Sequence, residues 1–313
     1  MTKEVRNIIK SFEKRGYQVK QVSKPWRSTV AIVEKNAILF VLKIVQSNDK
    51  TINPISDHSK IVTELQNQAV WDREVSQLLE GKNIPVKVPK VFESHFSANL
   101  GYILEEYVAG EKITNFTKWL PSIVETLHFF NTQKIAKLKL PLSEVSAYDW
   151  LIDRINKWSK EPLDEGAITS KQMAVVYQIV EDAKELLHFK LQHGDFSPGH
   201  LFDYHFPVFG LIDDEKGGIN KPAFYDAAYF YPKLYVNLGN QKIAKQFLKQ
   251  FREGLKENAD DFGKQFMALL TARAIGGIRD YIVQDKKLLD ERDFERREQF
   301  FKLCLRNDIN LLI

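Results

Sequence analysis

The chain has a single cysteine, Cys304, among its 313 residues, so no intrachain disulfide can form. A lone thiol suits the reducing conditions of the cytoplasm, which is the expected location. Cys304 lies in the apolar stretch FFKLCLRN, where a small buried side chain is expected rather than a catalytic thiol. The sequence also lacks an apolar run long enough for a transmembrane helix and the apolar core of a secretory signal, so no membrane partner is predicted.

Glycine and proline are scarce, with 15 and 11 residues, which excludes collagen-like and low-complexity chains. The excess of basic over acidic residues is only four, 45 against 41. This excess does not indicate a nucleic-acid partner, because a surface that follows phosphates concentrates its basic residues in a patch. Residues 1–107 carry the whole surplus, 16 basic against 12 acidic, either by chance or because this part faces an anion.

The length is typical of two domains or lobes, and the apolar periodicity changes near residue 107. Before that point the pattern predicts two helices, over residues 3–15 and 60–80. It also predicts five strands, over residues 17–23, 28–34, 37–46, 86–93 and 102–107. After it the pattern predicts mainly helices, over residues 115–135, 148–160, 170–190 and 223–313. One region of strands and loops is predicted between them, over residues 191–218. We therefore expect an α+β chain with a small β-rich lobe and a larger helical lobe.

The most informative stretch is LQHGDFSPGHL, in which Asp195 follows a His-Gly pair on a loop between two apolar runs. Asp213 follows eighteen residues later at the end of another apolar run, in GLIDDE. Two carboxylates at neighbouring strand ends can divide the work of phosphoryl transfer, since one can accept the proton of an attacking hydroxyl and the other can hold a divalent cation. As purely structural residues, Asp195 would cap a turn and Asp213 would join a surface acidic cluster.

With these motifs in this order, the sequence resembles the aminoglycoside phosphotransferase and choline kinase group, which are small-molecule kinases. HGDFSPGHL resembles the catalytic loop of that group, GLIDDE its metal-binding element, and FYDAAYF the element that follows. The resemblance covers most of the chain. It implies a bilobal protein-kinase-like fold, with a nucleotide-binding lobe over residues 1–107 and a catalytic and acceptor-binding lobe over residues 108–313.

The resemblance implies a role for each residue that matches a family motif. Asp195 matches the catalytic base and Asp213 the metal-binding aspartate. Lys43, in the strand-like run ILFVLKIV, matches the lysine that contacts the α- and β-phosphates. Glu74, on the long predicted helix, matches the acid that pairs with this lysine, and Glu64 is the alternative. The structural alternatives are an edge-strand charge for Lys43 and a solvated helix charge for Glu74.

The connector EEYVAGE resembles the hinge of the fold. There the main chain of Glu106 and Val108 would meet the edge of the adenine ring through hydrogen bonds. His193 and Asp226 are expected to support the catalytic loop rather than to take part in the reaction.

Two positions depart from the family pattern. His200 stands where the group has a metal-binding asparagine, and an imidazole nitrogen suits Mn²⁺ better than Mg²⁺. His200 could bind the metal while neutral, leave one metal on the aspartate alone, or mark a loss of catalysis. The glycine-rich phosphate loop is also missing, and its place holds side chains that either contact phosphates or belong to a solvated loop: Lys24, Arg27, Ser28 and Thr29.

Together these features predict an ATP-dependent phosphotransferase that acts on a hydroxyl of a small-molecule acceptor, with Mg²⁺ or Mn²⁺ as its cation. A catalytically inactive nucleotide-binding module is the alternative, and a protein kinase is disfavoured because no activation segment follows Asp213. The larger lobe has equal numbers of basic and acidic residues, 29 each, and so lacks the acidity that a polycationic aminoglycoside favours. Trp119, Trp150 and Trp158 either form a cage for a choline-type acceptor or pack the core. The sequence carries no signal for an oligomeric state.

Overall fold

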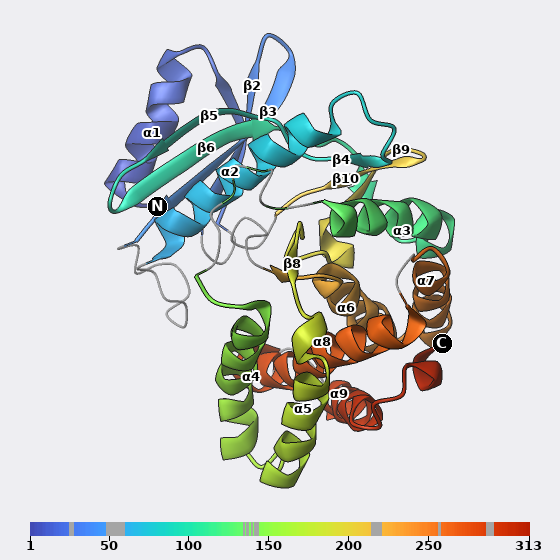
Figure 1. The fold of residues 1–313 in the computed structure, drawn as a ribbon. Helices are drawn as coiled ribbons and strands as arrows, with labels where there is room; N and C mark the ends of the chain where they lie inside the picture. Colours follow the sequence, from blue (N-terminus) through green and yellow to red (C-terminus); the bar gives the residue numbers. More distant parts are fainter. Residues whose placement is uncertain are drawn as a thin grey trace.

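The computed structural model describes most of the chain as two regions, a sheet with two helices and a larger set of helices (Figure 1). The described residues are 1–24, 28–47, 60–133, 135, 138, 140, 144–213, 221–255, 258–285 and 291–313. Arg27, residues 48–59 and the two acids after Asp213 lie outside these residues. Within the described parts, no helix combines the length and the apolar character that crossing a membrane requires.

The first region is built on a five-stranded antiparallel sheet with the order β1-β2-β3-β6-β5. Its strands are β1 (Gln18–Ser23), β2 (Thr29–Lys35), β3 (Ile38–Gln46), β5 (Val91–Phe96) and β6 (Leu100–Glu106). Strands β2 and β3 form a hairpin in which Lys35 pairs with Ile38, so the two turn residues are Asn36 and Ala37, both with positive φ. The single strand predicted over 86–93 is instead two strands in different sheets, because Pro89 between them has no N–H to donate.

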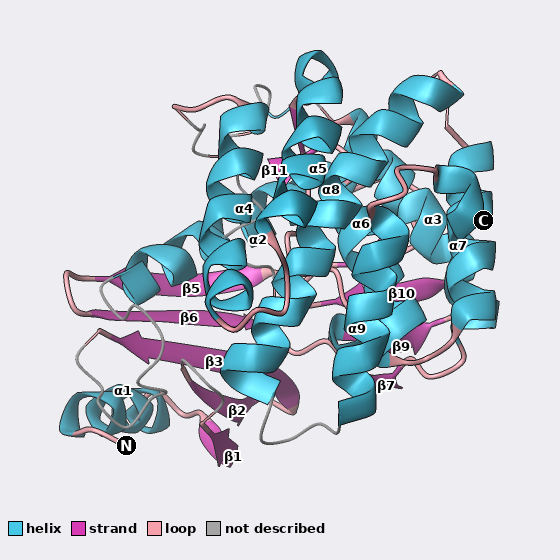
Figure 2. Ribbon diagram, turned by 90° about the horizontal axis from the view of Figure 1, so that it is seen from below, coloured by secondary structure: helices cyan, strands magenta, loops and turns pink. Residues whose placement is uncertain are grey.

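A helix covers each face of this sheet (Figure 2). On one face, α1 (Lys3–Lys14) packs Val5, Ile9 and Phe12 against the side chains of Ala31, Val33, Leu42, Ile44 and Leu104. On the other face, α2 (Ile61–Leu79) packs against Val45 and Ile103. Successive strand residues point to opposite faces, so Lys43 lies on the face that α2 covers.

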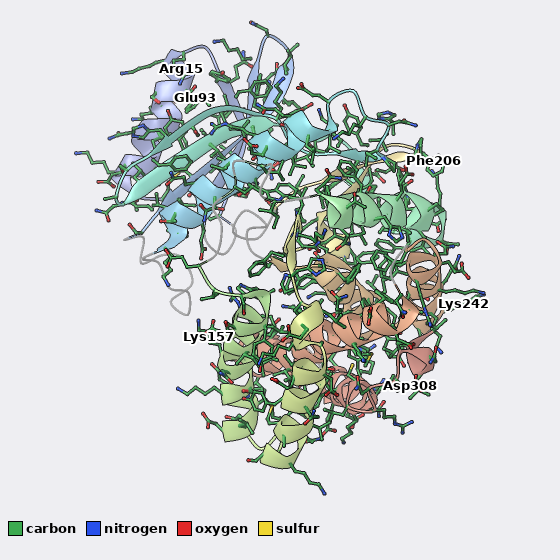
Figure 3. The ribbon with its side chains drawn as sticks, viewed as in Figure 1. Arg15, Glu93, Lys157, Phe206, Lys242 and Asp308 are labelled. Carbon is green, nitrogen blue, oxygen red and sulfur yellow. The ribbon has the colours of Figure 1, made fainter. Side chains whose placement is uncertain are left out.

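The rim of the sheet is tied to α1 by an ion pair on the surface. The Arg15 guanidinium, just after α1, donates to both carboxylate oxygens of Glu93 on β5, at 2.9 and 2.5 Å (Figure 3). Tyr102 on β6 donates to the same carboxylate at 2.7 Å. Because about half of the Arg15 side chain stays exposed to water, this pair contributes little to stability.

The second region is mainly helical. Its helices are α3 (Phe116–Thr132), α4 (Ala147–Asp164), α5 (Ser170–Asp182), α6 (Tyr225–Pro232), α7 (Gln241–Glu253), α8 (Ala259–Asp280) and α9 (Glu291–Cys304). Its main core is continuous and also includes Trp71 and Val75 of α2. Cys304 is fully buried in this core, as the sequence predicts.

Short strands connect the two regions. A four-stranded sheet has the order β4-β10-β9-β7, and a two-stranded sheet pairs β8 with β11. These strands are β4 (Val86–Lys87), β7 (Glu111–Lys112), β8 (Phe189–Lys190), β9 (Leu201–His205), β10 (Val208–Leu211) and β11 (Lys221–Pro222). Since β4 precedes the proposed lobe boundary at residue 107 and pairs in parallel with β10, the second sheet takes strands from both sides of it.

Candidate active site

The loop between β8 and β9 carries Asp195, and a buried carboxylate holds this loop in place. The two oxygens of Asp226, on α6, accept hydrogen bonds from the main-chain N–H groups of His193 at 2.5 Å and Gly194 at 2.8 Å. Gly194 has a φ of +88°, a conformation that glycine adopts without strain. The prediction that Asp226 supports the loop is confirmed. Burial raises the pKa of Asp226 to about 7, although both N–H donors favour its charged form.

A buried polar network behind the loop joins it to three helices. The carbonyl of Gln192 accepts from the indole N–H of Trp71 on α2 at 3.0 Å, and its side-chain oxygen accepts from the N–H of Asp226 at 2.9 Å. Its amide donates to Asn131 of α3 at 3.1 Å, and Asn131 also accepts from the N–H of Phe224 at 2.7 Å. Sequence reasoning missed these residues. The sequence around Gln192, FKLQHGD, carries no pattern that would have singled it out.

His193 is a structural residue, as predicted. Its side chain is buried, and its Nδ1 accepts from the N–H of Asp195 at 3.3 Å. The ring meets Trp71 edge to face at 5.3 Å. Burial lowers the pKa of His193 well below its usual value, so the ring is neutral at physiological pH. A neutral ring that is already hydrogen-bonded to the loop orients Asp195 instead of reacting.

Asp195 and His200 lie together at the open side of the loop. Their side chains are 28% and 24% exposed, and His200 Nδ1 is 3.8 Å from the Asp195 carboxylate. The same Nδ1 is 2.9 Å from the main-chain oxygen of Asp195. A carbonyl oxygen can only accept, so Nδ1 carries the proton and donates it. In the neutral ring, Nε2 therefore keeps its lone pair for a ligand.

Lys43 is the centre of a charged cluster that links the two regions. Its ammonium is 2.6 Å from the Asp213 carboxylate, just after β10, and 2.9 Å from Glu105 on β6. Burial opposes the charge of Lys43, but the two acids outweigh this effect and raise its pKa. The charge of Lys43 lowers the pKa of Asp213, whereas burial raises that of Glu105. The lysine is thus a buried cation held between two acids.

The partner predicted for Lys43 is wrong. Glu74 does not form an ion pair with Lys43; Glu105 and Asp213 do. On α2 it is Asp72 whose charge acts on the lysine. Asp72 is buried, whereas Glu74 is half-buried, and residues two positions apart lie on different faces of a helix. The sequence does not predict Glu105 as a partner of Lys43, because Glu105 belongs to the connector motif EEYVAGE.

The structure also corrects one of the predicted phosphate contacts, that of Thr29 at the start of β2. Thr29 is buried and pairs with Ile44 across the strands, so its side chain lies on the face that α1 covers. Lys43 pairs with Val30 and lies on the opposite face. The alternation of side chains along a strand therefore directs the Thr29 hydroxyl away from the cluster. Ser28 precedes the strand and is partly exposed, so its contact stays a prediction.

The connector places two predicted residues beside the cluster. The Glu106 N–H donates to the carbonyl of Lys90 at 2.9 Å, and its carboxylate pairs with Lys87 at 2.7 Å. The main chain of Val108 makes no hydrogen bond within the described part of the chain. Its side chain packs against Gly210, where any larger residue would collide with it. A main chain that is fixed by packing and has free polar groups suits an adenine edge.

Comparison with solved structures gives matches over nearly the whole chain. A complex of an aminoglycoside phosphotransferase APH(4)-Ia variant with AMP-PNP and hygromycin B matches with a TM-score of 0.63 and 12% identity, over 98% of this chain and 99% of that one. The GDP complex of aminoglycoside 2'-phosphotransferase-IIIa matches with 0.59 and 13%, over 98% and 99%. An ethanolamine kinase of Plasmodium vivax matches with 0.57 and 12%, over 94% and 85%. The chain has a bilobal protein-kinase-like fold.

Sequence comparison alone does not reach these proteins. No family model matches the chain, and no curated protein matches it by sequence. At 12 to 13% identity the likeness establishes the fold and leaves the chemistry to the site itself.

Asp213 and His200 are the described residues that fit a divalent cation. The main-chain oxygen of His200 accepts from the N–H of Ile212, next to Asp213, at 3.2 Å, and the Nδ1–H bond to the loop is the kind of outer hydrogen bond that orients a metal-binding imidazole. No cluster of three or more metal-binding side chains occurs among the described residues. Phosphate oxygens and water would therefore complete the coordination, and the mixed nitrogen and oxygen donors suit Mn²⁺ as well as Mg²⁺.

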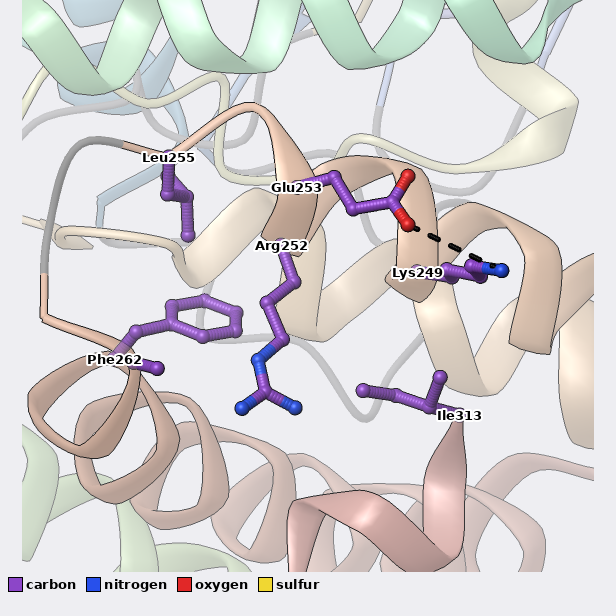
Figure 4. A pocket seen from close by; sticks show the side chains of 7 residues that line it. Lys249, Arg252, Glu253, Leu255, Phe262 and Ile313 are labelled. Atoms are coloured by element: carbon purple, nitrogen blue, oxygen red, sulfur yellow. Dashed lines mark ion pairs between the residues drawn. The ribbon is translucent and has the colours of Figure 1, made fainter.

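A separate cavity of about 450 Å³ opens between α7, the start of α8 and the last residue of the chain (Figure 4). Its lining includes Arg252, Phe262 and Ile313, and an ion pair joins Lys249 to Glu253 along α7. None of the predicted site residues lines this cavity.

Proposed function

We propose that this protein is an ATP-dependent phosphotransferase that acts on a hydroxyl of a small-molecule acceptor. The convergence of three charged groups carries the proposal. Lys43 and Asp213, 170 residues apart in the sequence, meet at 2.6 Å, and the N–H of Ile212, next to Asp213, donates to the main-chain oxygen of His200 in the segment after Asp195 at 3.2 Å. A cation and two carboxylates with separate supports are what phosphoryl transfer requires.

Each group has a distinct task in this proposal. Asp195 accepts the proton of the attacking hydroxyl, and its partly exposed carboxylate leaves room for that hydroxyl. Lys43 exchanges part of its pairing with Asp213 for phosphate oxygens of ATP. Asp213 and His200 would hold the divalent cation, which would supply charge neutralisation at the phosphates. The main chain of Glu106 and Val108 binds the adenine edge.

The related structures support this assignment at a coarser level. They are named as phosphotransferases or kinases of small molecules, and their complexes contain ADP, AMP-PNP or GDP. Nucleotide binding by a cleft of this fold is therefore expected here. The residues that would carry out transfer are those of the catalytic loop and of the charged cluster around Lys43.

Turnover with a panel of hydroxylated metabolites tests the proposal. The purified protein is incubated with ATP and either Mg²⁺ or Mn²⁺, and ADP release and the phosphorylated acceptor are measured, with Asp195→Asn as the control. We expect transfer to at least one acceptor by the wild type, and its loss in the variant while ATP still binds. ATP binding without transfer in either protein would instead identify a catalytically inactive nucleotide-binding module.

The cation assignment has its own test. His200→Asn replaces a nitrogen donor with an amide oxygen, so we expect the ratio of Mg²⁺-dependent to Mn²⁺-dependent turnover to rise. An unchanged ratio would remove His200 from the metal site and leave Asp213 alone as the ligand.

A further inference from the structure

Basic side chains and aromatic rings alternate along one side of α6. The Lys221 ammonium lies 5.3 Å from the ring of Trp150 and 5.7 Å from that of Tyr225. The guanidinium of Arg273, on α8, lies 5.9 Å from Tyr225, 4.0 Å from Tyr229 and 4.8 Å from the ring of Trp158. The ammonium of Lys233, which begins the turn η6 (Lys233–Asn237), lies 5.2 Å from Tyr229. We call these seven side chains the cation–aromatic row.

Lys233 is the cation of the row that lacks a counter-charge in contact. Its ammonium makes no hydrogen bond and no ion pair with any residue that the structure describes, and the side chain is half-buried. Burial and the nearby charge of Arg273 both lower its pKa. A half-buried ammonium beside a second cation gains free energy when an anion binds between them.

Two acids act on Lys233 without an ion pair to its ammonium in the described part of the chain. The acids whose charges reach Lys233 are Asp280, at the end of α8, and Asp195. Asp280 is itself close to several cations, Arg273, Lys233, Arg279 and Arg297, of which Arg279 pairs with Glu161 at 3.0 Å. Asp280 is therefore shared among several cations and is not held by Lys233 alone.

The row lies within electrostatic reach of the proposed base. Tyr225 of the row directly precedes Asp226, whose carboxylate accepts hydrogen bonds from His193 and Gly194 in the catalytic loop, and the charge of Asp195 acts on Lys233. An acceptor whose hydroxyl meets Asp195 would place its other groups near these side chains. Four members of the row are half-buried and so remain partly accessible to solvent: Lys233, Arg273, Tyr229 and Trp158.

The rings proposed from the sequence as a cage for an ammonium group are already covered. Cations of this chain lie over Trp150 and Trp158, and Trp119 is buried against the rings of Phe206 and Phe209. An ammonium acceptor would have to displace Lys221 or Arg273 from these rings. The row is therefore unsuited to a cationic acceptor of the choline type.

We propose that the acceptor is a hydroxylated anion, and that Lys233 and Arg273 bind its carboxylate or phosphate group while its hydroxyl meets Asp195. This inference rests on the proposed phosphotransferase function and deepens it by naming the charge class of the acceptor. Arg273, whose Nη1 already donates to the Tyr225 hydroxyl at 3.2 Å, would contribute a guanidinium to the anion, and Lys233 would add a second cation.

Matched six-carbon polyols test the inference by binding alone, without turnover. Gluconate, sorbitol and N-methylglucamine differ mainly in whether one end of the chain is anionic, neutral or cationic, and glucose 6-phosphate paired with glucose tests a phosphate in place of a carboxylate. Each compound is titrated calorimetrically into the full chain. We expect gluconate or glucose 6-phosphate to bind roughly tenfold more tightly than its neutral partner, because the anion gains charge-assisted hydrogen bonds.

Variants connect this preference to the row. Lys233→Met should weaken binding of the anion roughly tenfold, as expected for the loss of one charge-assisted contact, whereas Asp280→Asn should strengthen it. Lys242→Met, an exposed lysine on α7, is the matched control and should change nothing (Figure 3). Arg273→Lys retains the positive charge but loses the planar fork, and thermal unfolding of each variant shows whether it folds.

Four outcomes would overturn the inference. They are tighter binding of N-methylglucamine than of gluconate, anion binding that Lys233→Met leaves intact, an effect of Lys233→Met on ATP affinity instead, and no saturable binding of either anion at millimolar concentration. Failure of the proposed function is a distinct result, since it would show Lys233-dependent anion binding with no ADP release from any compound.

Discussion

The two halves of the candidate site are held by different forces. The loop of Asp195 is fixed by main-chain hydrogen bonds to Asp226 and by the buried amides behind it. The Lys43 ammonium is instead fixed by ion pairs with Glu105 and Asp213, the second of which is also a hydrogen bond. A hydrogen-bonded loop keeps its geometry with or without a ligand, whereas an ion pair can be redistributed when phosphates arrive.

This difference separates stability from binding in a way that mutations can measure. Leaving buried donors without partners destabilises the folded state, so changes behind the catalytic loop should lower the free energy of unfolding. Changes around Lys43 act on a cluster that opens toward Asp213, whose side chain is 46% exposed. Such changes should mainly alter nucleotide binding and turnover.

The largest effect on activity is expected from Asp195→Asn. The amide cannot accept the proton of the hydroxyl, so kcat should fall about a thousandfold, within the range for loss of a general base. Because Asp226 and not Asp195 holds the loop, the free energy of unfolding should change by less than about 0.5 kcal/mol. Steady-state kinetics and urea unfolding measure the two quantities. A variant that loses activity only because it unfolds would contradict the comparison.

Asp226→Asn should show the opposite balance. The amide group of asparagine would face one main-chain N–H with a donor, which leaves two buried donors opposed and costs about 3 kcal/mol of stability. Chemical unfolding followed by circular dichroism measures this loss, and Asp203→Asn, an exposed change on β9, is the control. A loss no larger than that of the control would mean that the loop is fixed without Asp226.

Sequence reasoning reached the fold and the catalytic loop because both are encoded locally. The hairpin of β2 and β3, the long helix α2 and the HGD motif each occupy a short continuous stretch with its own pattern. The supporting role of Asp226 followed from the same ordered motifs, and the structure confirms it.

The acid of α2 that acts on Lys43 could not be predicted from local sequence. The rotation of α2 in the packed structure decides which of its acids faces the sheet. The sequence motif predicts Glu74, whereas the structure places Asp72 there. Thr29 failed for a related reason, since the face of a strand is decided by register. Glu105 could have been found, because it follows Ile103 on the face of β6 that carries the core under α2.

Glu105→Gln should give an intermediate effect on the nucleotide side. The glutamine keeps the shape but removes one of the two charges that hold Lys43, so kcat/KM for ATP should fall roughly tenfold, the size of one charge-assisted hydrogen bond. Kinetics at varied ATP measures this, and Glu93→Gln on β5 serves as the control at a surface ion pair. If Glu105→Gln lowered only the free energy of unfolding and left kcat/KM unchanged, Glu105 would have a structural role like that of Asp226.

The smallest effect distinguishes the two acids of α2. Asp72→Asn removes a buried charge that acts on Lys43 without an ion pair to it, so kcat/KM for ATP should fall roughly threefold. Glu74→Gln should have a smaller effect, because its side chain lies on another face of the helix. The two variants are compared under the same Mg²⁺ and ATP concentrations. If Glu74→Gln were the more damaging, the sequence-based pairing would hold when nucleotide binds, and α2 would have to rotate to achieve it.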